Sequence, residues 1–445
     1  MTEDPPRPAS ARRYIDLRLE LRDLDAETGQ FTVSLSGQLG EFAGSALLAE
    51  SDMADPLAEL ADGGIEEEED RIAFGQALAD RLLPQGDIRT QVTEAIRRAE
   101  PSTGVRLRLV TSEPRLSGLP WEYTYLSLLG REDPADFLVL YPTVSLVRHE
   151  RLPLAPGELR GADPTDLRLL AVTANAPGYP ELDLNGERRA LEAALARLPP
   201  DLPGLTYRPV VENPTPGELQ TSLVGGAHLF HFAGHGGVNA GGGYLALPSA
   251  DGRSVQFGAD RLGKLLQAAG VRMAVLGACD SGRRGQSQWA GVVTDLVAGA
   301  AIPAVVAMQY PVRNSAAVAF AGAFYTAIAA GLSVDEAAWA GRFSLLDPDD
   351  LSASWGIPVL YLRSSDGVLF PSLADRPSST ADKLRTIVDI RVRSVQRGEV
   401  TGIDAADAEG LRAAAGFKVG IDVDTVSEGG IVTGIKIGRS TRERS

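Results

Sequence analysis

Apolar and polar positions alternate along the first part of the chain. Apolar residues at 15, 17, 19 and 21 alternate with polar ones, which predicts a half-buried strand. Residues 31–36 repeat this pattern after a Glu-Thr-Gly turn, so the two strands are expected to pair. Helical spacing over 72–83 and 87–99 leads to another alternating strand around 105–109, and the acidic stretch 64–70 is interpreted as a solvated linker. The pattern predicts an N-terminal α/β lobe over residues 14–160, preceded by a flexible tail at 1–13.

Beyond a break rich in Pro, Gly and Asp, apolar runs alternate regularly with helical segments. Strands are predicted at 167–173, 205–211, 227–233, 271–278, 303–308 and 358–362, and helices at 186–198, 216–223, 259–268, 290–297, 315–330 and 334–346. Thr215, Pro216 and Glu218 form a helix start signal. This alternation is typical of a mostly parallel sheet with helices on both faces. We therefore predict an α/β domain over residues 161–372 that contains a mostly parallel, six-stranded sheet.

The pattern changes again near residue 370. A Pro- and Ser-rich stretch leads to helical spacing over 382–396, and the sequence GEVTGI at 398–403 returns as GIVTGI at 430–435. Two similar β segments predict a small sheet, which also includes residues near 417–423. Residues 373–445 are interpreted as a small C-terminal module of one helix and β structure. Two interpretations remain open: the module covers part of the core, or it is a separate interaction module.

Composition and charge narrow the class of protein. The 445 residues predict two or three domains, and a hydrophobic content of 44% allows a sizeable core. The formal net charge of −16 makes the surface acidic, so neither nucleic acid nor membrane is expected as a direct partner. No apolar run reaches the roughly 18 to 20 residues that span a bilayer. A cytoplasmic location is the simplest expectation.

Two segments that contain candidate reactive side chains each lie at the end of a predicted buried strand. Residues 228–237 read HLFHFAGHGG, and residues 275–282 read VLGACDSG. Ligands bind outside the carboxyl ends of strands in open α/β sheets, so both segments deliver side chains to one edge. A thiol needs a nearby base to become a thiolate near neutral pH, and histidine suits that task. Cys279, the single cysteine of the chain, is therefore a candidate nucleophile, although an inert buried thiol is the alternative.

The order of residues in the chain discriminates between classes of hydrolase. All four histidines precede Cys279, which excludes the α/β-hydrolase and papain-like orders. The separation from His235, 279 − 235 = 44 residues, fits the spacing of about 50 in caspases. His228 and His231 are expected to pack within their strand, whereas His235 follows the strand among glycines and is the candidate base. The backbone N–H groups of Gly236 and Cys279 are the candidate oxyanion donors.

A metal site is the alternative for the three closely spaced histidines. The spacing His-x-x-His-x-x-x-His lacks the glutamate of a metalloprotease helix, and a strand would separate the first two ligands. A metal is therefore not expected, and the family resemblance described next implies a reaction that needs neither a metal nor an organic cofactor.

Residues 232–237 (FAGHGG) and 277–282 (GACDSG) resemble the CHAT family of caspase-like cysteine peptidases. The resemblance continues through 305–312 and 355–361. Upstream, LPWE at 119–122 and LVR at 146–148 resemble the lobe that precedes the peptidase core in many bacterial members. The resemblance implies a caspase-hemoglobinase fold and peptide-bond hydrolysis through an acyl-enzyme. It also implies His235 as general base and Cys279 as nucleophile.

The substrate preference stays open at this stage. Relatives that cut after arginine often carry an acidic residue two positions before the nucleophile, where this chain has Gly277, so a basic P1 residue is not indicated. Asp183, in the loop 174–183, and Asp280 are candidates for a substrate pocket. Asp280 is equally interpreted as a solvated carboxylate at the end of its strand.

The resemblance also implies a biological setting. Bacterial members are often effectors of anti-phage defence or cell death, so we expect a protein substrate and an activating protein partner at the C-terminal module. The alternatives are a non-enzymatic scaffold that acts through that module, and the same dyad acting on a small-molecule amide. Gly241–Gly243 are interpreted either as a mobile flap or as a tight hairpin turn. The oligomeric state stays open.

Overall fold

The computed structural model describes most of the chain between residues 12 and 374, together with three strands beyond residue 400. The described ranges are 12–49, 51–128, 136–148, 163–196, 205–207, 209–277, 290–299, 302–346, 353–374, 401–404, 421–426 and 431–437. Residues 1–11 of the tail expected at 1–13, and the helix expected at 382–396, lie outside these ranges. The tail was expected to extend too far, because Arg12 is buried and β1 begins at Arg13. No helix within them has the length and hydrophobicity that crossing a bilayer requires.

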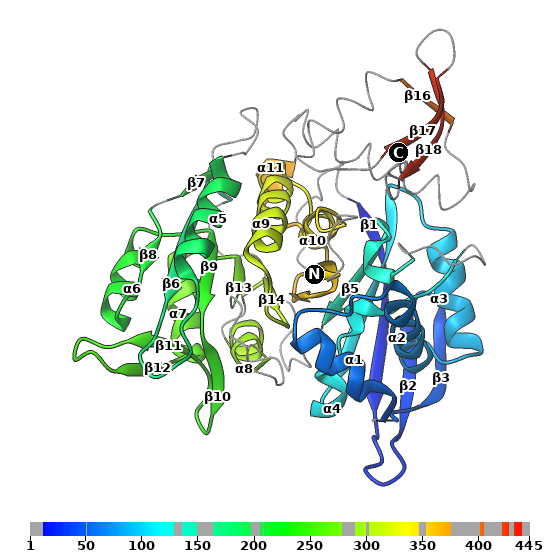
Figure 1. Cartoon of the computed structure of the whole chain (residues 1–445), viewed down its shortest axis with the longest axis horizontal. Helices are drawn as coiled ribbons and strands as arrows, with labels where there is room; N and C mark the ends of the chain where they lie inside the picture. Colours follow the sequence, from blue (N-terminus) through cyan, green and yellow to red (C-terminus); the bar gives the residue numbers. More distant parts are fainter. Residues whose placement is uncertain are drawn as a thin grey trace, which may run out of the picture.

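The N-terminal part contributes one end of a large sheet (Figure 1, blue to cyan). Its strands are β1 (Arg13–Arg22), β2 (Gln30–Gly37), β3 (Gly40–Leu47), β4 (Thr103–Thr111) and β5 (Val144–Arg148). Its helices are α1 (Ser51–Ala61), α2 (Glu68–Leu82), α3 (Asp87–Arg97) and α4 (Pro114–Ser117), with 3-10 turns at Trp121–Tyr123 and Leu138–Leu140. The expected hairpin of β1 and β2 is confirmed as an antiparallel pair.

One expectation for this part was wrong. The acidic stretch 64–70 was interpreted as a linker, but α2 begins at Glu68, so its last three acidic residues form the first turn of a helix. Carboxylates are favourable there because they face the positive end of the helix dipole.

The second part supplies the remaining strands of the large sheet (Figure 1, green to yellow). Its strands in the large sheet are β6 (Leu167–Ala174), β7 (Leu205–Tyr207), β8 (Val211–Glu212), β9 (Leu229–Gly234), β13 (Met273–Gly277), β14 (Ala304–Met308) and β15 (Pro358–Leu362). Its helices are α5 (Leu184–Ala196), α6 (Pro216–Val224), α7 (Ala259–Ala269), α8 (Ala290–Thr294), α9 (Asn314–Ala329), α10 (Val334–Phe343) and α11 (Pro371–Ala374). A π-helical turn, Asp295–Gly299, follows α8, and a 3-10 turn spans Ser354–Gly356.

Every expected core strand is present and the expected mostly parallel α/β arrangement is confirmed, but the expected number of six strands was wrong, because the strands of the N-terminal part join the same sheet. The sheet has 12 strands, and its main path runs β3-β2-β1-β4-β5-β15-β14-β13-β9-β6-β7, with β8 beside β6. The predicted strand at 205–211 is divided into the short strands β7 and β8. Strands β6, β9, β13 and β14 are parallel, and β15 is antiparallel to β14.

Successive residues of the core strands pack into two hydrophobic layers, one on each face of the sheet. Phe230 and Leu276 pack with α6 and α7 on one face, whereas Leu229 and Val275 pack with α5 and α9 on the other. This division explains the nearly continuous apolar runs in the sequence, because a strand covered on both faces has no solvated side. The sequence prediction of helices on both faces is thereby confirmed.

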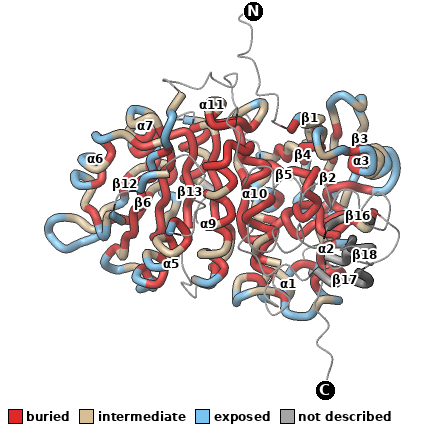
Figure 2. Tube along the Cα trace, turned by 90° about the horizontal axis from the view of Figure 1, so that it is seen from above, coloured by how far each residue is buried: buried red, intermediate tan, exposed pale blue. Residues whose placement is uncertain are grey.

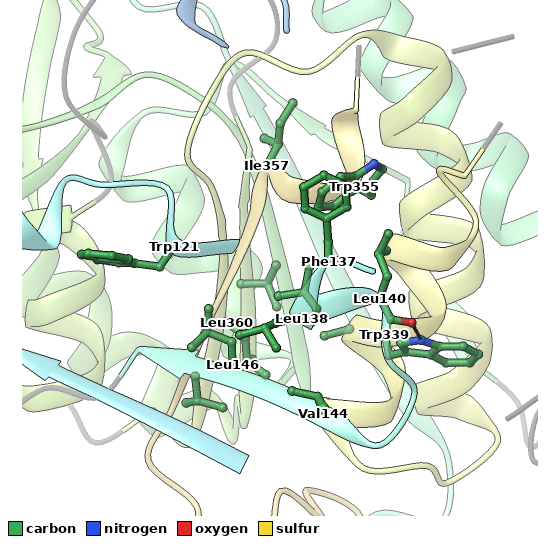
Figure 3. Close-up of a cluster of buried hydrophobic side chains, with 14 of the residues drawn as sticks. Trp121, Phe137, Leu138, Leu140, Val144, Leu146, Trp339, Trp355, Ile357 and Leu360 are labelled. Atoms are coloured by element: carbon green, nitrogen blue, oxygen red, sulfur yellow. Dashed lines mark hydrogen bonds between the residues drawn. The ribbon is translucent and has the colours of Figure 1, made fainter. Parts of the chain in front are cut away.

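One sheet and one core cross the boundary expected near residue 160. Strand β5 pairs with β15 through Arg148 and Tyr361, and buried positions run through the strands, α9 and α10 (Figure 2). The Phe137 and Trp355 rings lie 4.4 Å apart, and Trp339 donates a 3.0 Å hydrogen bond to the Leu140 carbonyl (Figure 3). The N-terminal part is therefore built into the core rather than attached by a linker.

The C-terminal strands form a sheet of their own. It contains β16 (Thr401–Asp404), β17 (Ile421–Val426) and β18 (Ile431–Ile437) in the order β16-β18-β17. The echoed segments pair with each other, because β16 is antiparallel to β18 with Thr401 opposite Thr433. The internal repeat therefore builds a small antiparallel sheet, as the sequence predicted.

Candidate active site

The carboxyl ends of β9 and β13 lie side by side at one edge of the sheet. Their parallel register places Ala233 opposite Gly277. His235 is the single residue between β9 and the next strand, β10 (Gly236–Asn239). Cys279 and Asp280, which follow β13 in the sequence, and His149 lie outside the described residues.

His235 is held in a defined tautomer by a backbone carbonyl. Its side chain is buried, at 4% exposure, and Nε2 lies 2.8 Å from the Pro180 carbonyl oxygen. A carbonyl oxygen only accepts hydrogen bonds, so Nε2 carries a proton, and Nδ1 is then the basic nitrogen of the neutral ring. The Tyr179 ring stacks on the imidazole, with centroids 5.2 Å apart and planes 27° apart.

Gly234 is required by packing beneath the histidine. A Cβ at this position would lie 2.7 Å from the Phe232 ring and 2.9 Å from the Ala174 carbonyl oxygen. The absence of a side chain therefore lets the end of β9 approach the end of β6, and with it the loop that carries Pro180.

The N–H of Gly236 points away from the hairpin that follows it. Strand β10 pairs with β11 (Gly242–Pro248), and Gly236 lies opposite Leu245. Ala246 donates its N–H to the His235 carbonyl at 2.9 Å, which makes the Gly236–Leu245 couple a non-hydrogen-bonded pair. The Gly236 amide is therefore directed out of the ladder, as an oxyanion donor requires.

A tight two-residue turn joins β10 and β11, the second of the two alternatives from the sequence; Gly241 lies in this turn, and Gly242 and Gly243 begin β11. Asn239 lies opposite Gly242, and β11 continues into a pair with β12 (Ser254–Gly258). The N–H of Gly243 donates to the Asp295 carboxylate at 2.7 Å. The hairpin is thereby tied to the π-helical turn after α8.

The other two described histidines have structural partners. His228 Nδ1 accepts the Arg168 backbone N–H at 3.1 Å, at the end of β9 opposite to His235. Burial, followed by the charges of Arg168 and Arg272, lowers the pKa of His228. His231 is buried, and its Nδ1 lies 2.9 Å from the Tyr325 hydroxyl of α9. Both residues therefore have structural roles, although His228 lies just before β9 rather than within it.

A buried carboxylate lies beside Gly277, where the sequence indicated no acidic group. Glu187, in the first turn of α5, has Oε1 3.6 Å from His231 Nε2 and 3.9 Å from the place of a Cβ on Gly277. A cavity of about 20 Å3 lies between these residues and the apolar side chains of α9, which is room for a single water. The carboxylate reaches the end of β13 from a different element, so local sequence around residue 277 does not reveal it.

The loop after β6 connects the histidine with a polar pocket. The Asn175 side chain bonds both the N–H and the carbonyl of Leu182 at 2.9 Å, which closes the loop. Asp183 accepts the Gly186 N–H at 2.9 Å and so caps α5. Asp183 also lines a pocket of about 430 Å3 with Glu181 and Glu212. The structure thus places this candidate pocket residue at the far side of the loop that holds His235.

The two upstream motifs, LPWE and LVR, meet in space. Arg148 bonds both carboxylate oxygens of Glu122, at 3.1 and 2.7 Å, and both side chains are buried. Arg148 also donates to Gln309 Oε1 at 3.1 Å, directly after β14. The N-terminal part therefore contacts the chain segment that leaves the same sheet edge as His235.

Several residues of the site escaped the sequence analysis. The Pro180 carbonyl is a backbone group and has no sequence signal. Tyr179 lies in the loop 174–183, where only acidic side chains were considered as pocket candidates. Glu187 lay within an amphipathic helix, where a single acidic residue normally indicates the solvent face. Among the described residues, no group of three or more His, Cys, Asp or Glu side chains is arranged to hold a metal ion.

Comparison with known proteins adds one family and a few structures. The family model described as CHAT domain matches residues 73–363, whereas no curated protein matches the sequence. Two structures of the Saccharomyces cerevisiae separase–securin complex are similar at 11% and 12% identity, with TM-scores of 0.44 and 0.42. Each match covers 78% of this chain and 30% of the other, so this chain spans less than a third of that length. The Arg-specific cysteine proteinase gingipain R is similar at 11% identity and a TM-score of 0.35, over 63% of this chain and 68% of the other.

Proposed function

Because the chain belongs to the CHAT domain family, we propose that it is a cysteine endopeptidase whose catalytic dyad is His235 and Cys279. The register of β9 and β13 is the observation that carries this proposal. Ala233 lies opposite Gly277, and each of these two residues is followed two positions later by one member of the dyad. Neighbouring strands lie about 4.8 Å apart, so the two chain segments leave the sheet from adjacent positions.

The proposed reaction proceeds through a thioester. His235 Nδ1 takes the proton of the Cys279 thiol, and the thiolate attacks the carbonyl carbon of the scissile peptide. The N–H groups of Gly236 and Cys279 donate to the oxyanion. The C–N bond then breaks, the imidazolium proton passes to the leaving amine, and the acyl group stays on sulfur. A water that gives its proton to His235 attacks the thioester, which releases the carboxylic product and restores the thiol.

The expected setting is a regulated effector that cleaves a protein in a bacterial defence or cell-death system. We place it in the cytoplasm, because a nucleophilic thiol must stay reduced to act. A protein partner at the C-terminal sheet would supply the activating signal.

Profiling of new protein N-termini tests this function directly. Cells expressing the intact chain are compared with cells expressing Cys279→Ala or His235→Ala, and His228→Ala serves as the matched control because His228 lies at the other end of β9. We expect termini that require Cys279 and His235 but not His228. Cleavage that persists in His235→Ala would remove His235 from the role of base.

A scaffold function is the second candidate, and the C-terminal sheet favours it. The order β16-β18-β17 leaves two edge strands, and an exposed edge can recruit a strand from a partner. Deletion of residues 375–445, which keeps the buried helix α11, separates the two functions. Retained cleavage with lost partner binding identifies an adaptor module, and a higher basal cleavage identifies an inhibitory one.

A further inference from the structure

We propose that Tyr179 and Tyr244 form a clamp that positions His235 and favours its protonated form. The proposal rests on the dyad proposed above, because the clamp matters only if His235 exchanges protons during the reaction. The two tyrosines come from different elements: Tyr179 from the loop after β6, and Tyr244 from β11. They are positioning residues, and they act through the imidazole rather than on the substrate.

The first contact is the stack of Tyr179 on His235. The rings are 27° from parallel with centroids 5.2 Å apart, so the imidazole lies over the face of the phenol ring. The face of an aromatic ring carries negative charge density and attracts a cation, and the attraction grows when water is excluded. Because His235 is buried, the stack stabilises imidazolium more than imidazole. The next residue, Pro180, holds the edge of the same ring, because its carbonyl accepts a hydrogen bond from Nε2.

The second contact fixes Tyr179 itself. Its hydroxyl forms a hydrogen bond of 3.3 Å with the Tyr244 hydroxyl. This hydrogen bond and then burial raise the pKa of Tyr244 to about 12, so the phenol stays protonated throughout the neutral range. Tyr244 lies over Gly237, where a Cβ would approach its hydroxyl to 2.6 Å. The glycine two residues after His235 therefore makes space for the phenol that completes the clamp.

Other titratable groups share this neighbourhood. Glu181 and Asp183 follow Pro180 in the same loop, Glu187 lies in the first turn of α5, and His231 precedes His235 on the same strand. Cys279 follows β13 and would itself influence the imidazole. A comparison of variants that all lack the thiol and keep the other groups therefore isolates the effect of the ring.

Histidine NMR in a Cys279→Ala background measures the effect without any need for a substrate. The chain has four histidines, and His235→Ala identifies the resonance of interest. We expect Tyr179→Leu to lower the titration midpoint of His235 by about half a unit to one unit. Tyr179→Phe keeps the aromatic ring, so its midpoint is expected to stay close to that of the parent. Equal midpoints in the parent and Tyr179→Leu, or equal losses in Tyr179→Leu and Tyr179→Phe, would overturn the clamp.

The hydroxyl pair is tested by a double-mutant cycle. Tyr179→Phe and Tyr244→Phe each break the same hydrogen bond, so the double variant is expected to shift the midpoint no further than either single variant. Additive shifts would show that the two tyrosines act separately and would refute the clamp. If the proposed dyad itself is wrong, the result is different: Cys279→Ala and His235→Ala leave cleavage unchanged, whatever the NMR titrations show.

In the active protein, the same variants are expected to change the alkaline limb of the pH profile of peptide cleavage. Loss of the ring in Tyr179→Leu moves the limb to lower pH, because imidazolium is the acid that protonates the leaving amine. Tyr179→Phe restores the limb. A loss of turnover with an unchanged limb would indicate a merely structural role for the tyrosine.

Discussion

Arg106→Met probes the junction between the N-terminal part and the core. Arg106 lies on β4, and its guanidinium bonds the two oxygens of Asp335 in the first turn of α10, at 2.9 and 2.7 Å. Both side chains are fully buried. Arg106 also donates to the carbonyls of Ser365 and Asp366, at 2.6 and 3.1 Å. Methionine keeps much of the volume but leaves a buried carboxylate without its cation.

The expected loss is about 3–5 kcal/mol of unfolding free energy, the usual result of removing one partner of a buried ion pair. Burial alone would raise the pKa of Asp335, but the charge and hydrogen bonds of Arg106, together with the hydrogen bond from Ser145, lower it overall. A lowered pKa in the folded state gives stability that is present above the unfolded value of about 3.9 and is lost as the pH falls through the folded value. The difference between the parent and Arg106→Met is therefore largest at neutral pH and shrinks as the pH falls, because the buried Asp335 of the variant has lost the cation that lowers its pKa and is protonated first.

Urea unfolding followed by tryptophan fluorescence is the assay, because Trp121, Trp339 and Trp355 are buried on both sides of the junction. Arg22→Met is the control, since its pair with Asp23 is exposed, and we expect a change within about 0.5 kcal/mol.

The double variant Arg106→Met/Asp335→Asn completes the cycle. It should lose at least about 2 kcal/mol less than the sum of the two single variants, because no unpaired charge stays buried. A cost for Arg106→Met below about 1 kcal/mol, or one that is the same at pH 7 and pH 3.5, would refute the reasoning.

Three further substitutions test local features. Ser333→Ala removes a buried capping box at α10 and should cost about 1–2 kcal/mol in urea unfolding; an unchanged midpoint would contradict the cap. Gly234→Ala forces a Cβ against the Phe232 ring, so we expect a loss of about 1–3 kcal/mol in thermal melting together with slower peptide cleavage. Tyr325→Phe leaves His231 Nδ1 without its hydroxyl partner at 2.9 Å, and chemical denaturation should report a loss of about 1–3 kcal/mol.

Elements with a strong local pattern were predictable from the sequence. The hairpin of β1 and β2 follows from strict alternation around a glycine turn. The capping box of α6 follows from Thr215 and Glu218, whose side chains bond each other's backbone N–H as expected. Such features depend on residues within a few positions of one another, so short-range physics is sufficient to specify them.

Elements whose stability comes from distant partners were not predicted. Strand β3 has few apolar residues and is half exposed, and its pairing with β2 is what makes it a strand. Strand β5 is five residues long and buried throughout, so it has no polar side to mark its period. Its position between β4 and β15 follows from the tertiary fold alone.

The sequence by itself determined the α/β class, the order of strands and helices along the core, and the candidate dyad, because periodicity and the order of His235 and Cys279 are local or one-dimensional properties. Only the tertiary structure decided that the two parts share one sheet, that Pro180 and Tyr179 hold His235, and that Glu187 lies beside Gly277. These contacts join residues that are far apart in the chain. Their partners are chosen by sheet register and by packing across the layers, which no local pattern of residues encodes.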